Sequence, residues 1–213
     1  EMQRALNLAE NEKTGEAIEQ LKTLLNRDKT DLRTYLALGG VYAQDKNFAD
    51  AAKIYHAAAG QIKSPERKDW PVFYQRGIAH ERLKEWDQAE PNFKKALELY
   101  PDQPQVLNYL GYSWVDRGEN LDEALLMIKK AVELRPQDGY IVDSLGWAYY
   151  KLGRIDEAVV QMEKAVTLRP NDPEINDHLG DVYWKAGRKL EARFQWNIAA
   201  SVDTEGNVKK RVE

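Results

Sequence analysis

The sequence predicts an all-α protein in which one helical hairpin is repeated about six times along 213 residues. Three observations predict this class. A glycine recurs at intervals of 34 to 38 residues, and an aromatic residue or a histidine follows each one three positions later. Apolar residues between these positions are three and four residues apart, which is the spacing of one face of an α-helix. The sequence has no sustained alternation of apolar and polar residues, so it predicts no strand.

Each repeat carries small and large residues at fixed distances. An alanine follows each glycine by twelve or thirteen residues, a large apolar residue comes four later, and a second alanine three later still. The glycines are Gly39, Gly77, Gly111, Gly146 and Gly180, and the large residues are Tyr55, Phe93, Ile128, Met162 and Trp196. We expect the small residues to let the two helices of a hairpin approach closely. Stacked hairpins would then bury the apolar stripe that one hairpin alone leaves uncovered.

The first repeat covers about 1–31 and lacks its first residues; Ala5 stands in the place of the glycine and Ala17 is the packing alanine. The second repeat covers 32–65. Four residues, 66–69, separate it from the third repeat, and we expect the stack to bend or to change its repeat angle there.

The third repeat, 70–103, contains Pro91 inside its expected second helix. Proline removes a backbone hydrogen bond from a helix interior, and its ring clashes with the preceding turn. We expect a kink in the helix or a late helix start. The alternative is little change, because Pro91 is near the helix N-terminus. The fourth repeat, 104–138, has one extra residue, which we place in the turn at about 118–120.

In the fifth repeat, 139–172, Gly153 separates two apolar stripes and therefore predicts the turn. The sixth repeat, 173–206, begins with a proline at the first helical position, where a missing amide hydrogen costs nothing. Residues 207–213 are expected to form a capping helix or a frayed end. The six repeats form a single array over 1–206.

This arrangement of glycine, aromatic, alanine and proline resembles the tetratricopeptide repeat (TPR). The clearest unit is GYIVDSLGWAYYKLGRIDEAVVQMEKAVTLRPN, residues 139–171. The resemblance implies a right-handed α-solenoid whose first helices line a concave groove. It also implies that the chain is a scaffold or adaptor that binds a partner protein or peptide there.

The resemblance further implies which residues line the groove, since TPR groove residues occupy set positions of each first helix. The implied partner-binding residues are Tyr74, Asn108, Tyr109, Tyr112, Tyr140, Asp143, Trp147, Tyr150, Asp177, Asp181 and Trp184. Tyrosine and tryptophan combine a large apolar area with one polar group, which suits binding surfaces. We expect exposure in the groove for Tyr112, Trp147, Tyr150 and Trp184. For Tyr109 and Tyr140, packing against the adjacent repeat is an equal alternative.

Three of these positions bear on the kind of partner. Asp143, Asp177 and Asp181 stand where a clamp for a peptide's terminal carboxylate would need cations or amides. The expected partner is therefore an extended peptide with apolar and basic side chains.

No converging set of reactive groups predicts an enzyme. The chain has no cysteine, and it has no nucleophile elbow, phosphate-binding loop or zinc-protease motif. A metal site built on Asp177, His178 and Asp181 would need further ligands from a neighbouring helix. We expect neither a metal nor another cofactor.

Charge and hydropathy limit the partners further. The 31 basic and 35 acidic residues give a net charge of −4, which argues against nucleic-acid binding. The sequence has no apolar run of about 18 residues, so it predicts no segment that inserts into a membrane. Self-association stays open, because exposed end repeats can stack on one another.

Residues 70–196 resemble the C-terminal repeats of large TPR proteins of Gram-negative bacteria, in the phrases LNYLGYSWVDRGENLDEAL, DGYIVDSLGWAYYKLGR and INDHLGDVYWKAGRKLEARFQW. Many of those are envelope lipoproteins, and some bring a carboxyl-terminal processing protease to its cell-wall hydrolase substrates. The resemblance implies a periplasmic or outer-membrane-associated protein. Because the chain starts at Glu1 and has no cysteine for lipid attachment, we expect a downstream part of a longer protein. The alternatives are a cytoplasmic assembly or chaperone-like adaptor and a metal-dependent enzyme.

Overall fold

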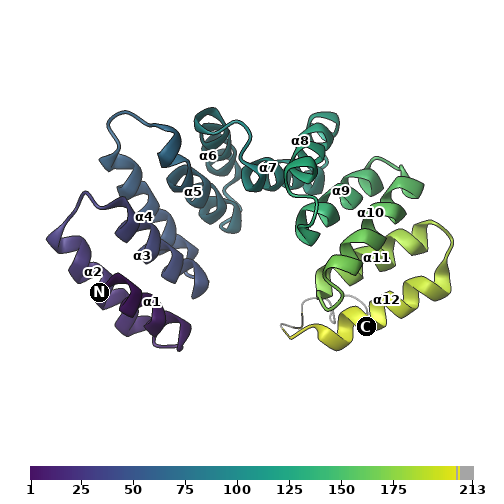
Figure 1. Cartoon of the computed structure of the whole chain (residues 1–213), viewed down its shortest axis with the longest axis horizontal. Helices are drawn as coiled ribbons and strands as arrows, with labels where there is room; N and C mark the ends of the chain where they lie inside the picture. The colour runs from purple at the N-terminus through teal and green to yellow at the C-terminus, as the bar shows by residue number, and fades with distance from the viewer. Residues whose placement is uncertain (205, 207–213) are drawn as a thin grey trace. The chain divides into compact units, whose positions relative to one another are not determined.

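The computed structural model describes residues 1–204 and 206, and this part of the chain forms helices and no strand. In these described residues, twelve α-helices follow one another as six hairpins (Figure 1). The hairpins are α1 (Met2–Glu10) with α2 (Thr14–Arg27), α3 (Leu32–Gln44) with α4 (Phe48–Gln61), α5 (Trp70–Arg82) with α6 (Trp86–Leu99), α7 (Pro104–Arg117) with α8 (Leu121–Leu134), α9 (Gly139–Lys151) with α10 (Ile155–Leu168), and α11 (Pro173–Lys185) with α12 (Lys189–Val202). The expected all-α architecture of helical hairpins is confirmed.

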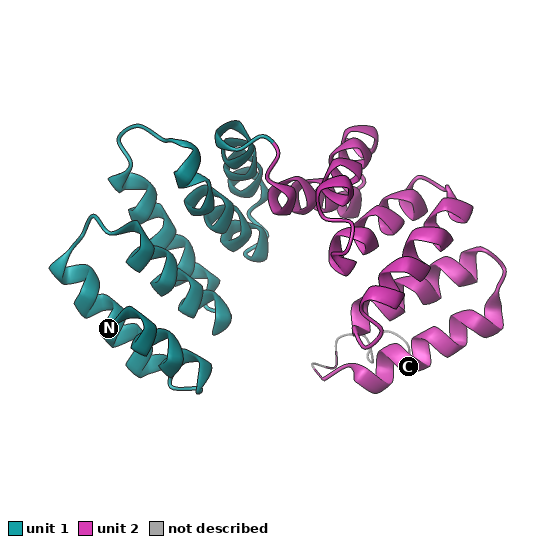
Figure 2. Cartoon of the chain, in the orientation of Figure 1, with its two compact units in different colours: residues 1–101 teal, residues 102–213 magenta. Residues whose placement is uncertain are grey.

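Contacts between the helices divide the chain into two compact units (Figure 2). The first unit, residues 1–101, holds α1 to α6, and the second begins at Asp102 and holds α7 to α12. Within each unit, the second helix of one hairpin packs against the first helix of the next. Consecutive first helices also contact one another: α7 contacts α9, and α9 contacts α11. Their side chains therefore form a continuous surface in each unit.

Each of five hairpins closes on a glycine that faces a large side chain of its own second helix. A methyl group added at Gly77 would lie 2.7 Å from the ring of Phe93, and one at Gly146 would lie 2.9 Å from Met162. The same crowding occurs in the pairs Gly39–Tyr55, Gly111–Ile128 and Gly180–Trp196. The close approach that the spacing predicts is confirmed in these hairpins.

A common turn joins the two helices of each hairpin. Two residues before the second helix, the backbone adopts a left-handed conformation at Glu12, Lys46, Lys84, Gly153 and Gly187. The next residue donates its N–H to a carbonyl five positions back, for example Arg154 to Tyr149 at 2.9 Å. This bond satisfies a carbonyl that the end of the first helix leaves free.

The turn between α7 and α8 contains the extra residue predicted near 118–120. Gly118 takes the left-handed position, and Glu119 donates to the carbonyl of Trp114 at 2.9 Å. Asn120 is then inserted before α8, and its φ of 45° is also left-handed.

We predict that Asn120→Ala destabilises the chain by about 1 kcal/mol, because an ordinary L-residue meets steric strain in this conformation. Asn120→Gly should be neutral or slightly stabilising, because glycine has no Cβ. Urea denaturation measures both effects, and Glu119→Ala in the same turn is the matched control. Equal midpoints for the alanine and glycine variants at position 120 would contradict the assignment.

Two irregular segments of the first unit keep helical structure. Residues 66–69 form the short 3₁₀-helix Arg67–Asp69, in which Glu66 donates its N–H to the Asp69 carboxylate at 2.9 Å. A bend of the stack at this point stays a prediction. The helix α6 runs without a break through Pro91, whose side chain is exposed, and begins five residues before it. A late helix start is therefore wrong.

The first hairpin forms one end of the array. In the first hairpin, Ala5 and Ala17 are fully buried in the core, as expected of the residues that replace the glycine and the packing alanine. The segment 207–213, expected to cap or fray, lies outside the described residues. Among the described helices, none combines the length and apolar character needed to cross a bilayer.

Candidate functional site

The expected binding residues lie mainly on the first helices of the second unit. All except Tyr74, which lies on α5 of the first unit, belong to α7, α9 and α11. These three helices contact one another in order. We call the surface that they form the inner face of the second unit.

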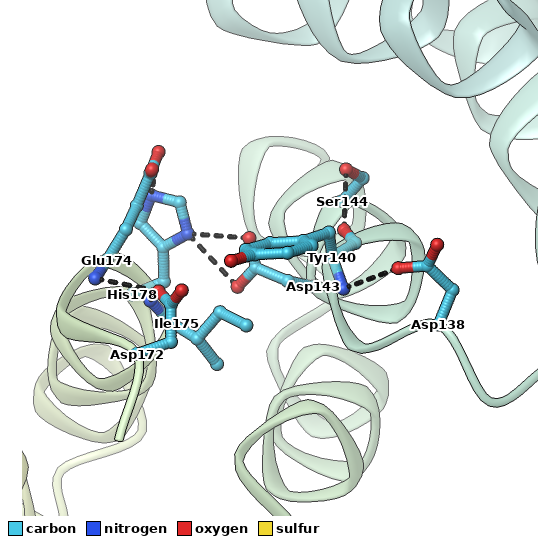
Figure 3. A network of polar contacts seen from close by, with 8 residues as sticks. All are labelled: Asp138, Tyr140, Asp143, Ser144, Asp172, Glu174, Ile175 and His178. Atoms are coloured by element: carbon cyan, nitrogen blue, oxygen red, sulfur yellow. Dashed lines mark hydrogen bonds and ion pairs between the residues drawn. The ribbon is translucent and has the colours of Figure 1, made fainter. Parts of the chain in front are cut away.

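A buried ion pair joins α9 to α11 on this face (Figure 3). The Nδ1–H of His178 donates to the two carboxylate oxygens of Asp143 at 3.1 and 3.0 Å. The two side chains are only 10% and 8% exposed. The pair therefore ties one hairpin to the next through buried charges rather than through apolar contact alone.

Side-chain caps set where the helices that carry this pair begin. Asp138 accepts backbone hydrogen bonds from the first turn of α9, and Asp172 accepts them from the first turn of α11, at 3.0 to 3.3 Å (Figure 3). Such caps satisfy amide groups that the helix itself leaves free, and they define its first residue. Asp143 and His178 follow within two turns of these fixed points, so the caps position both.

The imidazole of His178 is a cation at neutral pH. Burial alone would lower its pKa, but the charge and hydrogen bond of Asp143, followed by the charges of Glu174 and Asp177, raise the pKa of His178 to about 9. Its Nε2 lies 4.0 Å from the Glu174 carboxylate. The ring thus stands between a carboxylate of α9 and one of its own helix.

Glu174 is the accessible carboxylate of this cluster. Its side chain is 67% exposed. Partial burial by the neighbouring protein raises the pKa of Glu174, and the negative charges of Asp143 and Asp172 raise it further, whereas the charge of His178 lowers it. On α7, burial raises the pKa of the half-buried Tyr112, and the charges of Glu174 and Asp143 raise it further. Side chains from all three helices therefore converge around Glu174.

Trp147 packs against this cluster and does not face solvent. Its ring stacks on His178 at a centroid distance of 4.2 Å and on Tyr150 at 4.7 Å, with interplanar angles of 18° and 19°. The side chain is only 9% exposed. The expectation that Trp147 is exposed in the groove is wrong, because the rings of His178 and Tyr150 cover it.

The remaining aromatic residues differ in accessibility. Trp184 is 42% exposed, as expected, and Tyr140 is 49% exposed beneath the guanidinium of Arg169. Half-buried positions are found for Tyr109, Tyr112 and Tyr150 and for the amide residue Asn108. Tyr74 is half-buried within the first unit, where burial raises its pKa to about 12.

The acidic residues of α11 do not form a metal site. Asp177 is buried, and Asp181 accepts a hydrogen bond from the indole N–H of Trp196 at 3.2 Å. His178 is directed to Asp143 instead. In the part of the chain that the structure describes, no group of His, Asp and Glu side chains could hold a metal ion.

The pairing of His178 with Asp143 and the central position of Glu174 were not predicted from the sequence. The signal was available, since an acidic and a titratable basic residue occupy adjoining positions of successive first helices. Asp143 lies on the first helix of the preceding repeat, whereas Asp177 and Asp181 lie on the same helix as His178.

Comparisons with known proteins agree with the repeat pattern. Models of the tetratricopeptide repeat match residues 2–66 and 70–103, and a TPR repeat model matches residues 146–187. A search of curated proteins finds no match.

Several solved structures share the fold. A chain of the APC/C hetero-tetramer Cut9–Hcn1 aligns with a TM-score of 0.80 at 18% identity, over 94% of this chain and 39% of that one. A tetratricopeptide repeat protein from Parabacteroides merdae aligns with a TM-score of 0.74 at 14% identity, over 99% and 85% of the two chains. MamA from Desulfovibrio magneticus aligns at 0.65 and 21%, over 83% and 97%. At such identities the likeness is one of fold.

The present chain therefore spans well under half of the Cut9–Hcn1 chain that it matches. Helical hairpins of one design, glycines at the repeat period and three matching repeat models lead to one conclusion. The chain belongs to the tetratricopeptide repeat proteins.

Proposed function

We propose that the inner face of the second unit binds an extended segment of a partner protein that carries apolar and basic side chains. TPR arrays serve in general as scaffolds for protein–protein interaction, and that general role holds for this chain. The observation that carries the finer proposal is the accessible carboxylate of Glu174 beside the half-buried ring of Tyr112. The half-buried Tyr150 lies farther along the same face, near the end of α9.

The charges on this face favour a particular kind of side chain. Asp143 and Glu174 lie in the first half of their helices, whereas Lys151 and Lys185 lie in the last turns. A lysine or arginine of the partner would be attracted to Glu174, and partly shielded charges interact more strongly than fully solvated ones. Apolar side chains would cover the tyrosine rings, which offer area at a small cost in conformational entropy.

The cellular setting is a second part of the proposal. The phrases within residues 70–196 favour a periplasmic or outer-membrane-associated adaptor, including the role of bringing a protease to its substrate. The alternative is a cytoplasmic assembly adaptor that uses the same face. A signal peptide and a lipid-attachment cysteine encoded upstream, together with fractionation of cells that express the whole protein, would separate the two settings.

Peptide binding tests the inner face directly. We expect a synthetic library in which lysine or arginine alternates with leucine, phenylalanine or tyrosine to bind, measured by fluorescence anisotropy. Glu174→Gln combined with Tyr150→Ala should weaken that binding at least tenfold, about 1.4 kcal/mol. The single variant Trp147→Ala is unsuitable, because it removes a buried ring.

A matched library with glutamate in place of the basic residues is the charge control, and Glu133→Gln on α8 is the variant control. Both should show that the loss belongs to the inner face. Equal binding of the two libraries, or unchanged affinity of the Glu174 and Tyr150 variant with its helicity intact, would contradict the proposal.

A further inference from the structure

Three exposed apolar side chains occupy one position on successive second helices of the second unit. Leu126 on α8, Val160 on α10 and Phe194 on α12 are each the sixth residue of their helix, and they are 68%, 61% and 63% exposed. We call these three residues the outer row. The same position of the first unit holds Glu19, Lys53 and Pro91, so the row is confined to the second unit.

The three helices present the same face to solvent. Two residues before each member of the outer row, Ala124, Ala158 and Ala192 are fully buried. Because equivalent alanines point into the core on all three helices, the residues on the opposite side of each helix are equivalent as well, and they point to solvent. The outer row therefore consists of equivalent residues of stacked repeats, carried on second helices that do not pack closely against one another.

Charges flank the row in a fixed order. Four residues before Leu126 and Val160 stand Asp122 and Asp156, and four residues after them stand Lys130 and Lys164. All four charged side chains are exposed. Residues four apart on a helix share one face. On α8 and α10, therefore, an acid, an apolar residue and a base follow one another along the solvent side.

The last helix carries only apolar residues along the corresponding line. Leu190 is 82% exposed, Phe194 follows it by four residues, and the half-buried Ile198 follows by four more. Single exposed apolar residues are ordinary on protein surfaces. The repetition of an exposed apolar residue at one position of three second helices, with an apolar line on α12, is the observation that needs an explanation.

We propose that this surface binds a second copy of the chain, in a symmetric dimer whose outer helices run antiparallel. A two-fold axis along the outer row would set each helix against its own copy in the opposite direction. Asp122 would then face Lys130 of the second copy, and Asp156 would face its Lys164. The outer row would meet itself, so one surface supplies both halves of an isologous interface.

The order of charges selects this arrangement over others. Rotating the second copy by half a turn in the plane of the interface would set α10 parallel to its own copy, with Asp156 on Asp156 and Lys164 on Lys164, and like charges in contact oppose association. It would also set α8 against α12, which has no charged residue at the matching positions. An unrelated partner would have to carry the same acid–apolar–base order in reverse, whereas a second copy has it without further requirement. The dimer leaves α7, α9 and α11 outside the interface, so it does not depend on peptide binding.

Charge reversal gives a test with its own rescue. One variant carries Lys130→Glu and Lys164→Glu, and the other carries Asp122→Lys and Asp156→Lys. Each variant alone would bring like charges together, and we expect its self-association to weaken by a factor of about 10² or more. An equimolar mixture restores opposite charges at every contact and should form a heterodimer.

Sedimentation equilibrium of the full chain measures the result. At protein concentrations up to roughly 0.1 mM, which would reveal a micromolar dissociation constant, we expect a dimer for the natural chain and for the mixture. Each charge-reversal variant on its own should be a monomer. The control variant carries Lys22→Glu and Lys53→Glu on the first unit and should remain a dimer, and circular dichroism should show unchanged helicity throughout.

Any of three results would overturn the inference. A natural chain that is monomeric over the whole range would mean that the outer row binds something other than a second copy. A dimer that persists in both reversal variants, or a mixture that stays monomeric, would mean that self-association uses another surface. The exposed ends of the array are the other place where self-association could occur.

Discussion

Replacing Asp143 with asparagine should destabilise the second unit by about 3 kcal/mol at neutral or mildly acidic pH, since removing one partner of a buried ion pair leaves the other uncompensated. The carboxylate accepts from His178 through two oxygens, at 3.1 and 3.0 Å. Asparagine keeps the shape and one oxygen but loses the charge. Urea denaturation followed by circular dichroism measures the change. Asp116→Asn, an exposed change on α7, should shift the midpoint little.

The same pair makes stability depend on pH in a defined direction. The pKa of His178 is about 9 in the folded chain and near its ordinary value of 6.5 in the unfolded chain. A group with a raised pKa in the folded state stabilises it fully below the unfolded pKa, and this contribution is lost as the pH rises through the folded value. The difference between the natural chain and Asp143→Asn should therefore be large at about pH 6 and small at about pH 9.5. An equal difference at both values would contradict the assigned protonation.

Gly39→Ala should destabilise the second hairpin by about 1–3 kcal/mol, while Gly40→Ala one residue later should be neutral or stabilising. A methyl group at Gly39 would overlap the ring of Tyr55, which is 1% exposed and has no room to move aside. At Gly40 nothing lies within 4 Å, so alanine adds only its better helix propensity.

Both substitutions add the same atoms to the same helix, so each is the other's control. Thermal or urea unfolding measures the difference. Similar midpoints for the two variants would mean that α3 and α4 separate without cost, contrary to the close approach seen here. Gly146→Ala should cost less than Gly39→Ala, because its neighbour Met162 is flexible.

The repeat pattern predicted the hairpins well because the contacts that close a hairpin are local. Gly77 and Phe93 are 16 residues apart, and their spacing follows from the lengths of two helices and one turn. The position of the extra residue near Asn120 could be predicted for the same reason. Pro91 could not be decided, since tolerance of a proline depends on whether its ring faces solvent.

The site was less predictable because its contacts run between repeats. Whether position nine of a first helix is open depends on the residue that the next repeat places beside it. For Trp147 that residue is His178, whose ring covers it. The charged state of His178 depends in turn on Asp143, 35 residues away. Periodicity within one repeat carries no information about such lateral partners.

The glycine pairs described above also have a consequence for how fast the chain can fold. Each glycine and its large partner are separated by only 16 or 17 residues, so a hairpin can form its tightest contact without waiting for distant chain. Proteins dominated by such short-range contacts fold rapidly, and repeat arrays can nucleate at any of their units. During synthesis, the hairpin of Gly39 and Tyr55 can therefore assemble while the later repeats are still being translated.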